Sequence, residues 1–173
     1  MLDLLEERPS IRNEYVVHRL TSMAVALVAG AAALAGLGTS GAWAGEPAPS
    51  GIVTLKNDAT ANCVDHDPGW SGVITRYCNG GNNQRFEVLP GRTEGYFLLK
   101  NLATGNCLDN DTNEGHIMAR GCNVSNGYQN WAQEGRIIRN YQTGACLDDD
   151  PNHRYLMARG CNGGGNQNWE LVR

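Results

Sequence analysis

A unit of about forty residues occurs three times in the last two-thirds of the chain. Its anchor is a pair of cysteines separated by fifteen positions in every copy. An apolar residue and an aspartate follow each first cysteine, and an asparagine, a small-residue turn and a Gln-x-aromatic motif follow each second cysteine. The pairs are Cys63 and Cys78, Cys107 and Cys122, and Cys146 and Cys161. A repeat of this length indicates copies of one supersecondary unit that pack together to bury a shared core.

Short β-rich segments open the units, at residues 53–57, 97–101 and 136–140. Turn residues then recur at the roughly 8–12-residue spacing that is typical of all-β barrels and sandwiches. We expect about four short strands in each unit. Because one unit alone cannot bury its apolar face, the three units are expected to close around one axis.

The cysteines predict three disulfide bonds. All six lie after residue 44 and follow an export signal, so their oxidation is expected. Six cysteines permit many pairings, and the repeat narrows these to the threefold-symmetric sets, of which pairing within each unit is the simplest. A metal site is disfavoured because no Cys-x-x-Cys spacing occurs. No cofactor is expected.

Residues 1–44 have the pattern of a secretory signal peptide. An uncharged run at residues 23–37 follows Arg19 and precedes the tripeptide Ala-Trp-Ala at residues 42–44. The run is too short to span a bilayer core of about 30 Å comfortably. We therefore expect cleavage after Ala44, a secreted, extracellular protein and no membrane insertion after cleavage.

The remaining chain is expected to hold one domain. Residues 45–51 are predicted to form a short linker that leads into the domain, and residues 46–50 a disordered lead-in. Residues 52–173 are predicted to form the domain, with repeats at about 52–95, 96–134 and 135–173. The formal net charge of −4 argues against nucleic-acid binding, which needs a clustered basic face.

The repeat resembles that of the ricin B-type lectin family over about residues 52–173. Gln-x-Trp in the second and third units, Gln-x-Phe in the first, and the upstream Cys-Leu-Asp or Cys-Val-Asp carry the resemblance. It implies an all-β fold, the β-trefoil, and a non-enzymatic protein that binds glycans or polysaccharide. The aromatic residues of the motif, Phe86, Trp131 and Trp169, are expected to lie in the core, and the glutamines to hold the turn.

The candidate sugar site of each repeat centres on the aspartate two positions after the first cysteine. An ionised carboxylate accepts hydrogen bonds from two adjacent sugar hydroxyls, and this is the role that the resemblance implies. Asparagine amides both donate and accept, and tyrosine adds an apolar face and a hydroxyl group. The alternative is that the aspartates cap turns through backbone amides. The expected carbohydrate-binding residues are Asp65, Asn79 and Asn83, then Asp109, Asn123 and Tyr128, then Asp148, Asn162, Asn166 and Gln167.

One departure from the resembling family concerns the aromatic platform against which a sugar ring lies. Two positions before each second cysteine, where the platform usually stands, the chain has Arg76, Arg120 and Arg159. Three roles are open to these arginines: stacking on a sugar, pairing with a nearby aspartate, or recognising a carboxylated or sulfated glycan. The intervening loops hold aromatic residues that are candidates either to replace the platform or to pack. They are Trp70, His116 and Tyr155.

Aspartates two positions apart raise the question of a calcium site. The pairs are Asp65 and Asp67, Asp109 and Asp111, and Asp148 and Asp150. The second pair begins a segment with Glu114 where an EF-hand requires glycine and Arg120 where it requires glutamate, so it is not an EF-hand. We expect the second aspartate of each pair to face water.

Two functions from different classes fit these features. The first is a secreted lectin with up to three similar glycan sites. The second is a scaffold for protein–protein contact, a subunit or an inhibitor, whose sugar sites have decayed; the three arginines favour it. An enzyme is disfavoured because the histidines stand at unmatched places in the units and no Ser-His-Asp set is found.

Overall fold

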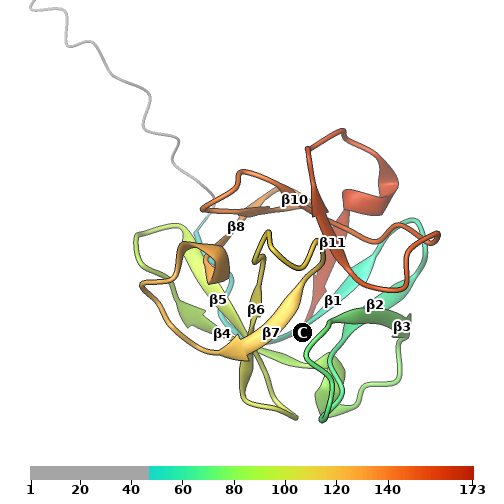
Figure 1. Ribbon diagram of the computed structural model, residues 1–173, viewed down its shortest axis with the longest axis horizontal. Coiled ribbons are helices and arrows are strands. Elements are labelled where there is room, and N and C mark those ends of the chain that lie inside the picture. The colour runs from blue at the N-terminus through green and yellow to red at the C-terminus, as the bar shows by residue number, and fades with distance from the viewer. Residues whose placement is uncertain (1–46) are drawn as a thin grey trace, which may run out of the picture. The chain divides into compact units, whose positions relative to one another are not determined.

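The computed structural model describes residues 47–173 (Figure 1). The predicted signal peptide and the first two residues of the predicted linker lie outside the described residues. Short β-strands and one-turn 3-10 helices alternate in an order that occurs three times. The first repeat contains β1 (Gly51–Asn57), β2 (Asn62–Asp65), β3 (Ile74–Tyr77), η1 (Asn82–Gln84) and β4 (Phe86–Pro90). The second contains β5 (Tyr96–Asn101), β6 (Asn106–Asp109), β7 (Met118–Gly121), η2 (Gly127–Gln129) and β8 (Trp131–Glu134). The third contains β9 (Ile137–Asn140), β10 (Cys146–Asp148), β11 (Met157–Arg159), η3 (Gly165–Gln167) and β12 (Trp169–Val172). The expected four strands per unit are confirmed.

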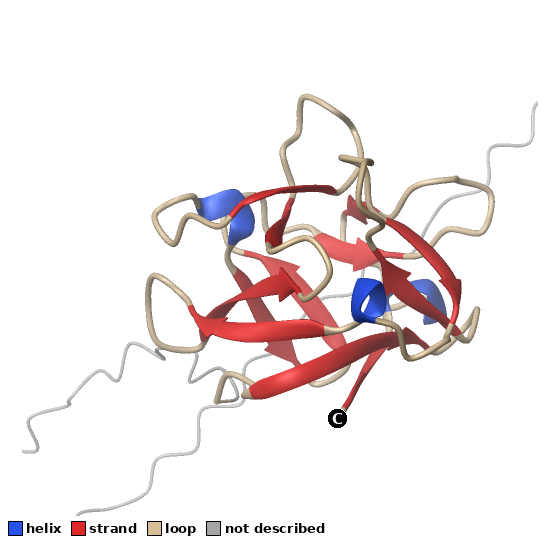
Figure 2. Ribbon diagram, turned by 90° about the horizontal axis from the view of Figure 1, so that it is seen from below, coloured by secondary structure: helices blue, strands red, loops and turns tan. Residues whose placement is uncertain are grey.

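The first and fourth strands of the repeats form a closed antiparallel barrel. Along it, β1 pairs with β4, β4 with β5, β5 with β8 and β8 with β9. A single bridge between Ile137 and Asn168 connects β9 to β12, and β12 pairs with β1. The hairpins β2–β3, β6–β7 and β10–β11 add the remaining strands (Figures 1 and 2). Every barrel strand therefore has a neighbour on both sides, so the barrel has no exposed sheet edge.

The three hairpins meet in a ring of backbone hydrogen bonds. The amide of Val73 donates to the carbonyl of Ile117 at 2.9 Å, Ile117 to Leu156 at 2.8 Å, and Leu156 back to Val73 at 2.9 Å. All three side chains are buried in the core. Each repeat therefore supplies one donor and one acceptor to a closed cycle on the approximate threefold axis.

The aromatic residues of the Gln-x-aromatic motifs lie in the core, as predicted. Phe86, Trp131 and Trp169 are almost fully buried. The indole Nε1 of Trp131 donates to the carbonyl of Leu108 at 3.2 Å, and that of Trp169 to Leu147 at 3.0 Å. Because each indole has a polar partner, its burial leaves no unsatisfied donor.

All three disulfide bonds join the two cysteines of one repeat. Their pairing is Cys63 with Cys78, Cys107 with Cys122, and Cys146 with Cys161. Each bond links β2 to β3, or the equivalent strands, across a loop of fifteen positions. Closing loops of this length stabilises a fold by about 3 kcal/mol each in the chain-entropy model.

The segment before the barrel contacts the core. Ala48 is half-buried and packs against the core cluster. Residues 47–50 therefore do not behave as the disordered lead-in that their prolines predicted. An apolar contact with the barrel holds this short stretch in place.

Buried asparagines connect neighbouring repeats. Each stands at the end of the opening strand of a repeat, and its Nδ2 donates to a carbonyl in the turn of the preceding repeat at 2.8 Å. The pairs are Asn101 to Asn83, Asn140 to Tyr128, and Asn57 to Asn166. These bonds hold the turns that carry several of the predicted site residues.

Candidate functional site

The predicted aspartates occupy equivalent places at the ends of β2, β6 and β10. Their side chains are nearly enclosed: Asp65 is 0% exposed, Asp109 1% and Asp148 4%. The strand ends there and the chain turns into a loop, which brings the carboxylate beside the Gln-x-aromatic turn of the same repeat. Each repeat therefore presents one buried carboxylate at the same position.

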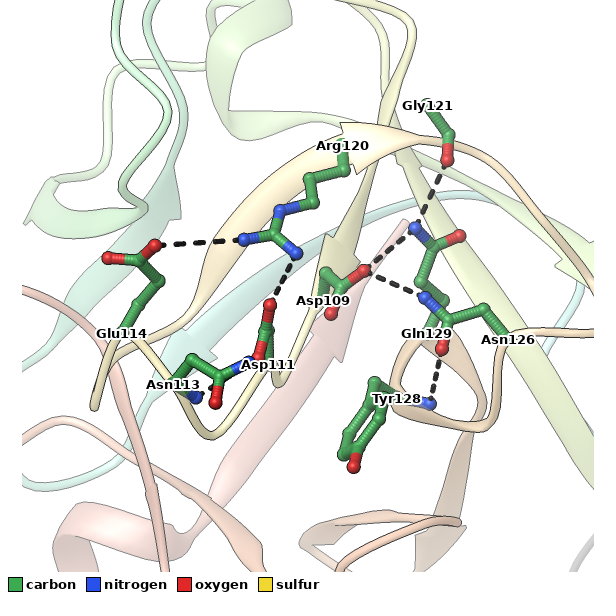
Figure 3. A network of polar contacts seen from close by, with 9 residues as sticks. All are labelled: Asp109, Asp111, Asn113, Glu114, Arg120, Gly121, Asn126, Tyr128 and Gln129. Atoms are coloured by element: carbon green, nitrogen blue, oxygen red, sulfur yellow. Dashed lines mark hydrogen bonds and ion pairs between the residues drawn. The ribbon is translucent and has the colours of Figure 1, made fainter.

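One oxygen of each carboxylate is held by amide donors. Oδ2 of Asp109 accepts from Nε2 of Gln129 and Nδ2 of Asn126, both at 3.0 Å (Figure 3). Oδ2 of Asp65 accepts from Gln84 at 2.9 Å and Asn83 at 2.7 Å. Oδ1 of Asp65 and Oδ1 of Asp109 are buried and have no hydrogen-bond partner in the described protein. Two repeats thus hold an unpaired acceptor in the same arrangement.

The glutamines secure the turn on which the site depends. In the second repeat, Nε2 of Gln129 also donates to the carbonyl of Gly121 at 3.1 Å, and its Oε1 accepts from the backbone amide of Asn123 at 2.7 Å. The third repeat is built in the same way: Gln167 is buried, and its Nε2 donates to Oδ2 of Asp148 at 2.8 Å. The side-chain amide of Gln167 is already hydrogen-bonded within the protein. Its role is therefore to orient the carboxylate of Asp148.

The asparagines that follow the second cysteines lie on the surface. They are Asn79, Asn123 and Asn162, all exposed. Each Oδ1 accepts from the backbone amide two residues later, at 2.7 to 3.0 Å. Their Nδ2 groups have no protein partner within residues 47–173. These amides are therefore available as donors beside each buried carboxylate.

The second repeat assigns one role differently from the sequence prediction. Counting back from the glutamine equated Tyr128 with Asn83, but the residue that donates to the carboxylate is Asn126. The turn between the second cysteine and the glutamine is one residue longer in this repeat. Tyr128 lies half-buried below the carboxylate (Figure 3). Counting from the second cysteine gives Gly127 instead, so neither count along the sequence leads to Asn126. In the third repeat, half-buried Asn166 has no side-chain bond to Asp148.

The three arginines pair with the second aspartate of each Asp-x-Asp motif. The N–O distances are 2.9 Å for Arg76–Asp67, 2.5 Å for Arg120–Asp111 and 2.8 Å for Arg159–Asp150. The expectation that these aspartates simply face water is therefore wrong, and pairing is the role that the arginines adopt. This pairing decides between the three roles that were open to the arginines. In each hairpin, the arginine on the second strand faces the aspartate at the start of the loop that joins the two strands.

Two of these aspartates have lowered pKa values. For Asp111, the backbone amide of Asn113 lowers the pKa most, and the hydrogen bond from Arg120 adds to the effect. For Asp150, the backbone amide of Asn152 lowers the pKa most. The same ion pair raises the pKa of Arg120. The pairs are therefore charged at neutral pH.

The aromatic residues of the loops do not form one platform per repeat. The rings of His116 and Tyr155 stack with centroids 4.3 Å apart, although they come from different repeats. The guanidinium of Arg154 lies 4.6 Å from the centre of the Trp70 ring and 5.6 Å from that of Tyr155. The three loops therefore bring their aromatic residues together at one place. The sequence had suggested one separate platform in each repeat.

The described residues contain no group of three or more His, Cys, Asp or Glu side chains that could hold a metal ion. Within the same residues, none of the helices has the length and apolar character that crossing a membrane requires.

Residues 51–171 match the family described as "Ricin-type beta-trefoil lectin domain". A search of curated protein sequences gives no significant match. The matched region includes all three repeats and agrees with the resemblance that the repeat motifs carry.

Solved structures with the same fold include a designed protein and natural ones. The designed threefold-symmetric protein ThreeFoil is 20% identical with a TM-score of 0.63, over 72% of this chain and 99% of its own. SeviL bound to asialo-GM1 saccharide is 14% identical with a TM-score of 0.59, over 72% and 98%. The GlcNAcα1-4Gal-releasing endo-β-galactosidase from Clostridium perfringens is 17% identical with a TM-score of 0.63, over 72% of this chain but 33% of the enzyme. These likenesses confirm the predicted β-trefoil fold.

Proposed function

Since the chain belongs to the ricin-type β-trefoil lectin domain family, we propose that it is a secreted carbohydrate-binding protein with a similar glycan site in each repeat. The family supports carbohydrate binding as the general role. The three disulfide bonds support an oxidising, extracellular location. The endo-β-galactosidase is three times longer than the matched region, so a domain of this kind also occurs attached to an enzyme.

The observation that carries the proposal is the unpaired carboxylate oxygen that recurs in two repeats. Oδ1 of Asp65 and of Asp109 is buried without a protein donor. Leaving a charged acceptor buried and unpaired costs several times more free energy than a normal hydrogen bond contributes. A hydroxyl donor would satisfy this oxygen, and sugars supply adjacent hydroxyls. The same carboxylate keeps its orientation because amides hold its other oxygen.

The surrounding residues support a site made for a hydroxyl-rich ligand. In the second repeat the turn with Asn126 and Tyr128 lies on one side of Asp109, and the Arg120–Asp111 ion pair lies on the other (Figure 3). Asn123, earlier in the same turn, is exposed. The ion pair leaves little net charge beside the site. A neutral sugar is therefore the ligand class that the three repeat sites favour.

A second candidate is a scaffold for protein contact. The pairing of all three arginines with aspartates favours it, because a paired arginine no longer stacks freely on a sugar. Near-complete burial of the three aspartates points the same way. In this case the carboxylate and the glutamine serve only to hold the turn.

A glycan array on the mature protein, followed by titration of variants, tests the proposal. Replacing Asp65, Asp109 and Asp148 together by Asn should abolish binding, since each single change weakens one site by about 1–3 kcal/mol. Asp58→Asn is the matched control, because Asp58 pairs with Arg136 outside the repeat sites. A triple variant that binds as tightly as the parent would replace the lectin hypothesis with the scaffold hypothesis.

Because a buried aspartate also supports the fold, a second set of variants separates binding from folding. Replacing the exposed Asn79, Asn123 and Asn162 by Ala leaves the bonds between aspartate and glutamine in place. Binding should fall while the circular dichroism spectrum stays unchanged. With three sites around one axis, a polysaccharide should bind about 10²-fold more tightly than a monosaccharide. Losing the first or second site should weaken binding most, since Asp65 and Asp109 hold the unpaired carboxylate oxygen.

A further inference from the structure

A separate hollow lies over the ring of hydrogen bonds that joins the three hairpins. All three repeats line it: Trp70, Ser71 and Gly72 from the first, Glu114, His116 and Met118 from the second, and Arg154 and Tyr155 from the third. Its volume is about 480 Å³, within the range of about 300–1,000 Å³ typical of small-molecule sites. None of the residues assigned to the three repeat sites lines it.

One of three equivalent positions at the hollow has no side chain. His116 and Tyr155 directly precede Ile117 and Leu156 of the ring, and Gly72 precedes Val73. A Cβ atom at Gly72 would stand 2.7 Å from Cε1 of Tyr155 and 3.2 Å from Nε2 of His116. The two rings therefore occupy the space that a side chain at position 72 would need, and glycine lets them approach the backbone of the first repeat.

Aromatic surface and an unpaired cation meet at the rim of the hollow. The indole of Trp70 is 42% exposed, and the guanidinium of Arg154 lies 4.6 Å from its ring centre. Arg154 has no carboxylate partner among residues 47–173, unlike the three arginines of the repeat sites. Stacking holds the guanidinium plane and leaves its N–H edge free to bind an anion.

The second repeat contributes acceptors to the hollow. Nδ1 of His116 lies 2.8 Å from the carbonyl of Glu114, so Nδ1 is the donor, and in this tautomer Nε2 is an acceptor. The carboxylate of Glu114 lies 3.9 Å from Arg120 and is half exposed. These acceptors suit hydroxyl groups, and the guanidinium of Arg154 suits a carboxylate.

We propose that this axial hollow binds one carboxylated pyranose per chain, a uronic acid or a sialic acid at the end or side of a glycan. The C–H face of the sugar lies on Trp70, its carboxylate pairs with the N–H edge of Arg154, and its hydroxyls face His116 and Glu114. The site is single because it uses one loop from each repeat. It is independent of the three repeat sites, so it stands or fails separately from the proposed function.

The experiment compares methyl β-glucuronide with methyl β-glucoside, which differ only in the carboxylate, and adds methyl α-N-acetylneuraminide to distinguish the two sources of a carboxylated ring. Isothermal titration calorimetry on the mature protein should give one site per chain for at least one of the two acidic sugars. Arg154→Ala and Trp70→Ala should each weaken it about tenfold or more. The exposed-arginine control Arg85→Ala should leave it unchanged.

Several results would overturn the proposal: equal binding of glucoside and glucuronide, no measurable binding of either acidic sugar, or acidic-sugar binding that survives Arg154→Ala. Arg154→Lys is informative because it keeps the charge but loses the planar fork, so intermediate binding is expected. Gly72→Ala should displace Tyr155 and abolish acidic-sugar binding. The circular dichroism spectrum of that variant should match that of the parent, which shows that the protein is folded.

Discussion

The turns at the barrel periphery and the loops around the axis differ in how far they keep the threefold repeat. In the turns, the carboxylate, the glutamine and the arginine ion pair recur with nearly the same distances in every repeat. Around the axis, the equivalent positions hold three different residues, Gly72, His116 and Tyr155. The contacts that recur in every repeat are those that fold each repeat. The residues that differ between repeats lie where the three repeats meet.

This comparison separates two kinds of binding. Three equivalent turns suit a ligand that repeats, such as a polysaccharide chain or a dense glycan surface. A single asymmetric hollow suits one terminal sugar with its own charge. Under the two proposals above, the same fold combines repeated weak recognition with one selective contact, and variants in the two regions should behave differently.

The largest contrast is expected between two tryptophans. Trp131→Ala removes a fully buried ring and its hydrogen bond to Leu108, and should lower the free energy of unfolding by about 3–5 kcal/mol. Trp70→Ala, in the axial loop, should change it by less than about 1 kcal/mol because the ring is largely exposed. Urea denaturation measures both. Similar losses in the two variants would mean that the axial loops also carry the stability of the fold.

A smaller effect is expected at Gln129. Replacing it by Ala removes the donor to Asp109 and the acceptor for the Asn123 amide, and should cost about 1–3 kcal/mol. The matched control is Gln133→Ala, whose amide donates to the carbonyl of Gly135 in an exposed turn. Thermal unfolding of the two variants provides the measurement. If Gln133→Ala destabilised the protein as much as Gln129→Ala, the turn would not depend on the buried bonds.

The smallest effect concerns the ion pairs. The pKa of Asp111 is lowered from 3.8, first by the Asn113 amide and then by Arg120. Its stabilising effect is therefore complete above its ordinary pKa, and is lost as the pH falls through the lowered pKa. Comparing the unfolding midpoints of the parent and Asp111→Asn from about pH 6 down to about pH 2.5 checks this. The difference should shrink only below pH 3.8; a difference that shrank near neutral pH would contradict it.

Features that each repeat determines for itself were predictable from the sequence. The disulfide pairing, the buried aromatic residues and the four strands per unit follow from spacings within one unit, and a threefold recurrence supports each of them. The role of Asn126 is an exception, because counting from Cys122 or from Gln129 leads to Gly127 or Tyr128.

Features that depend on the path of a loop or on contacts between repeats were not predictable. The pairing of Arg120 with Asp111 was one of three open choices, because it depends on the path of the loop after β6. The stacking of His116 on Tyr155 requires knowing which loops meet at the axis. The two residues stand at equivalent places, nine positions after the first cysteine of their repeats. That equivalence does not encode which loops come into contact.

The pairing of β1 with β12 has a consequence for the order in which the protein folds. The register joins Thr54 to Val172 and Asn57 to Trp169, so β1 finds its partner in the last of the described strands. The barrel is therefore incomplete until β12 has been made, and the cost of closing so long a loop falls on a late step of folding. Until then, the edge of β1 that β12 covers has no neighbour and is open to pairing with a strand of another chain.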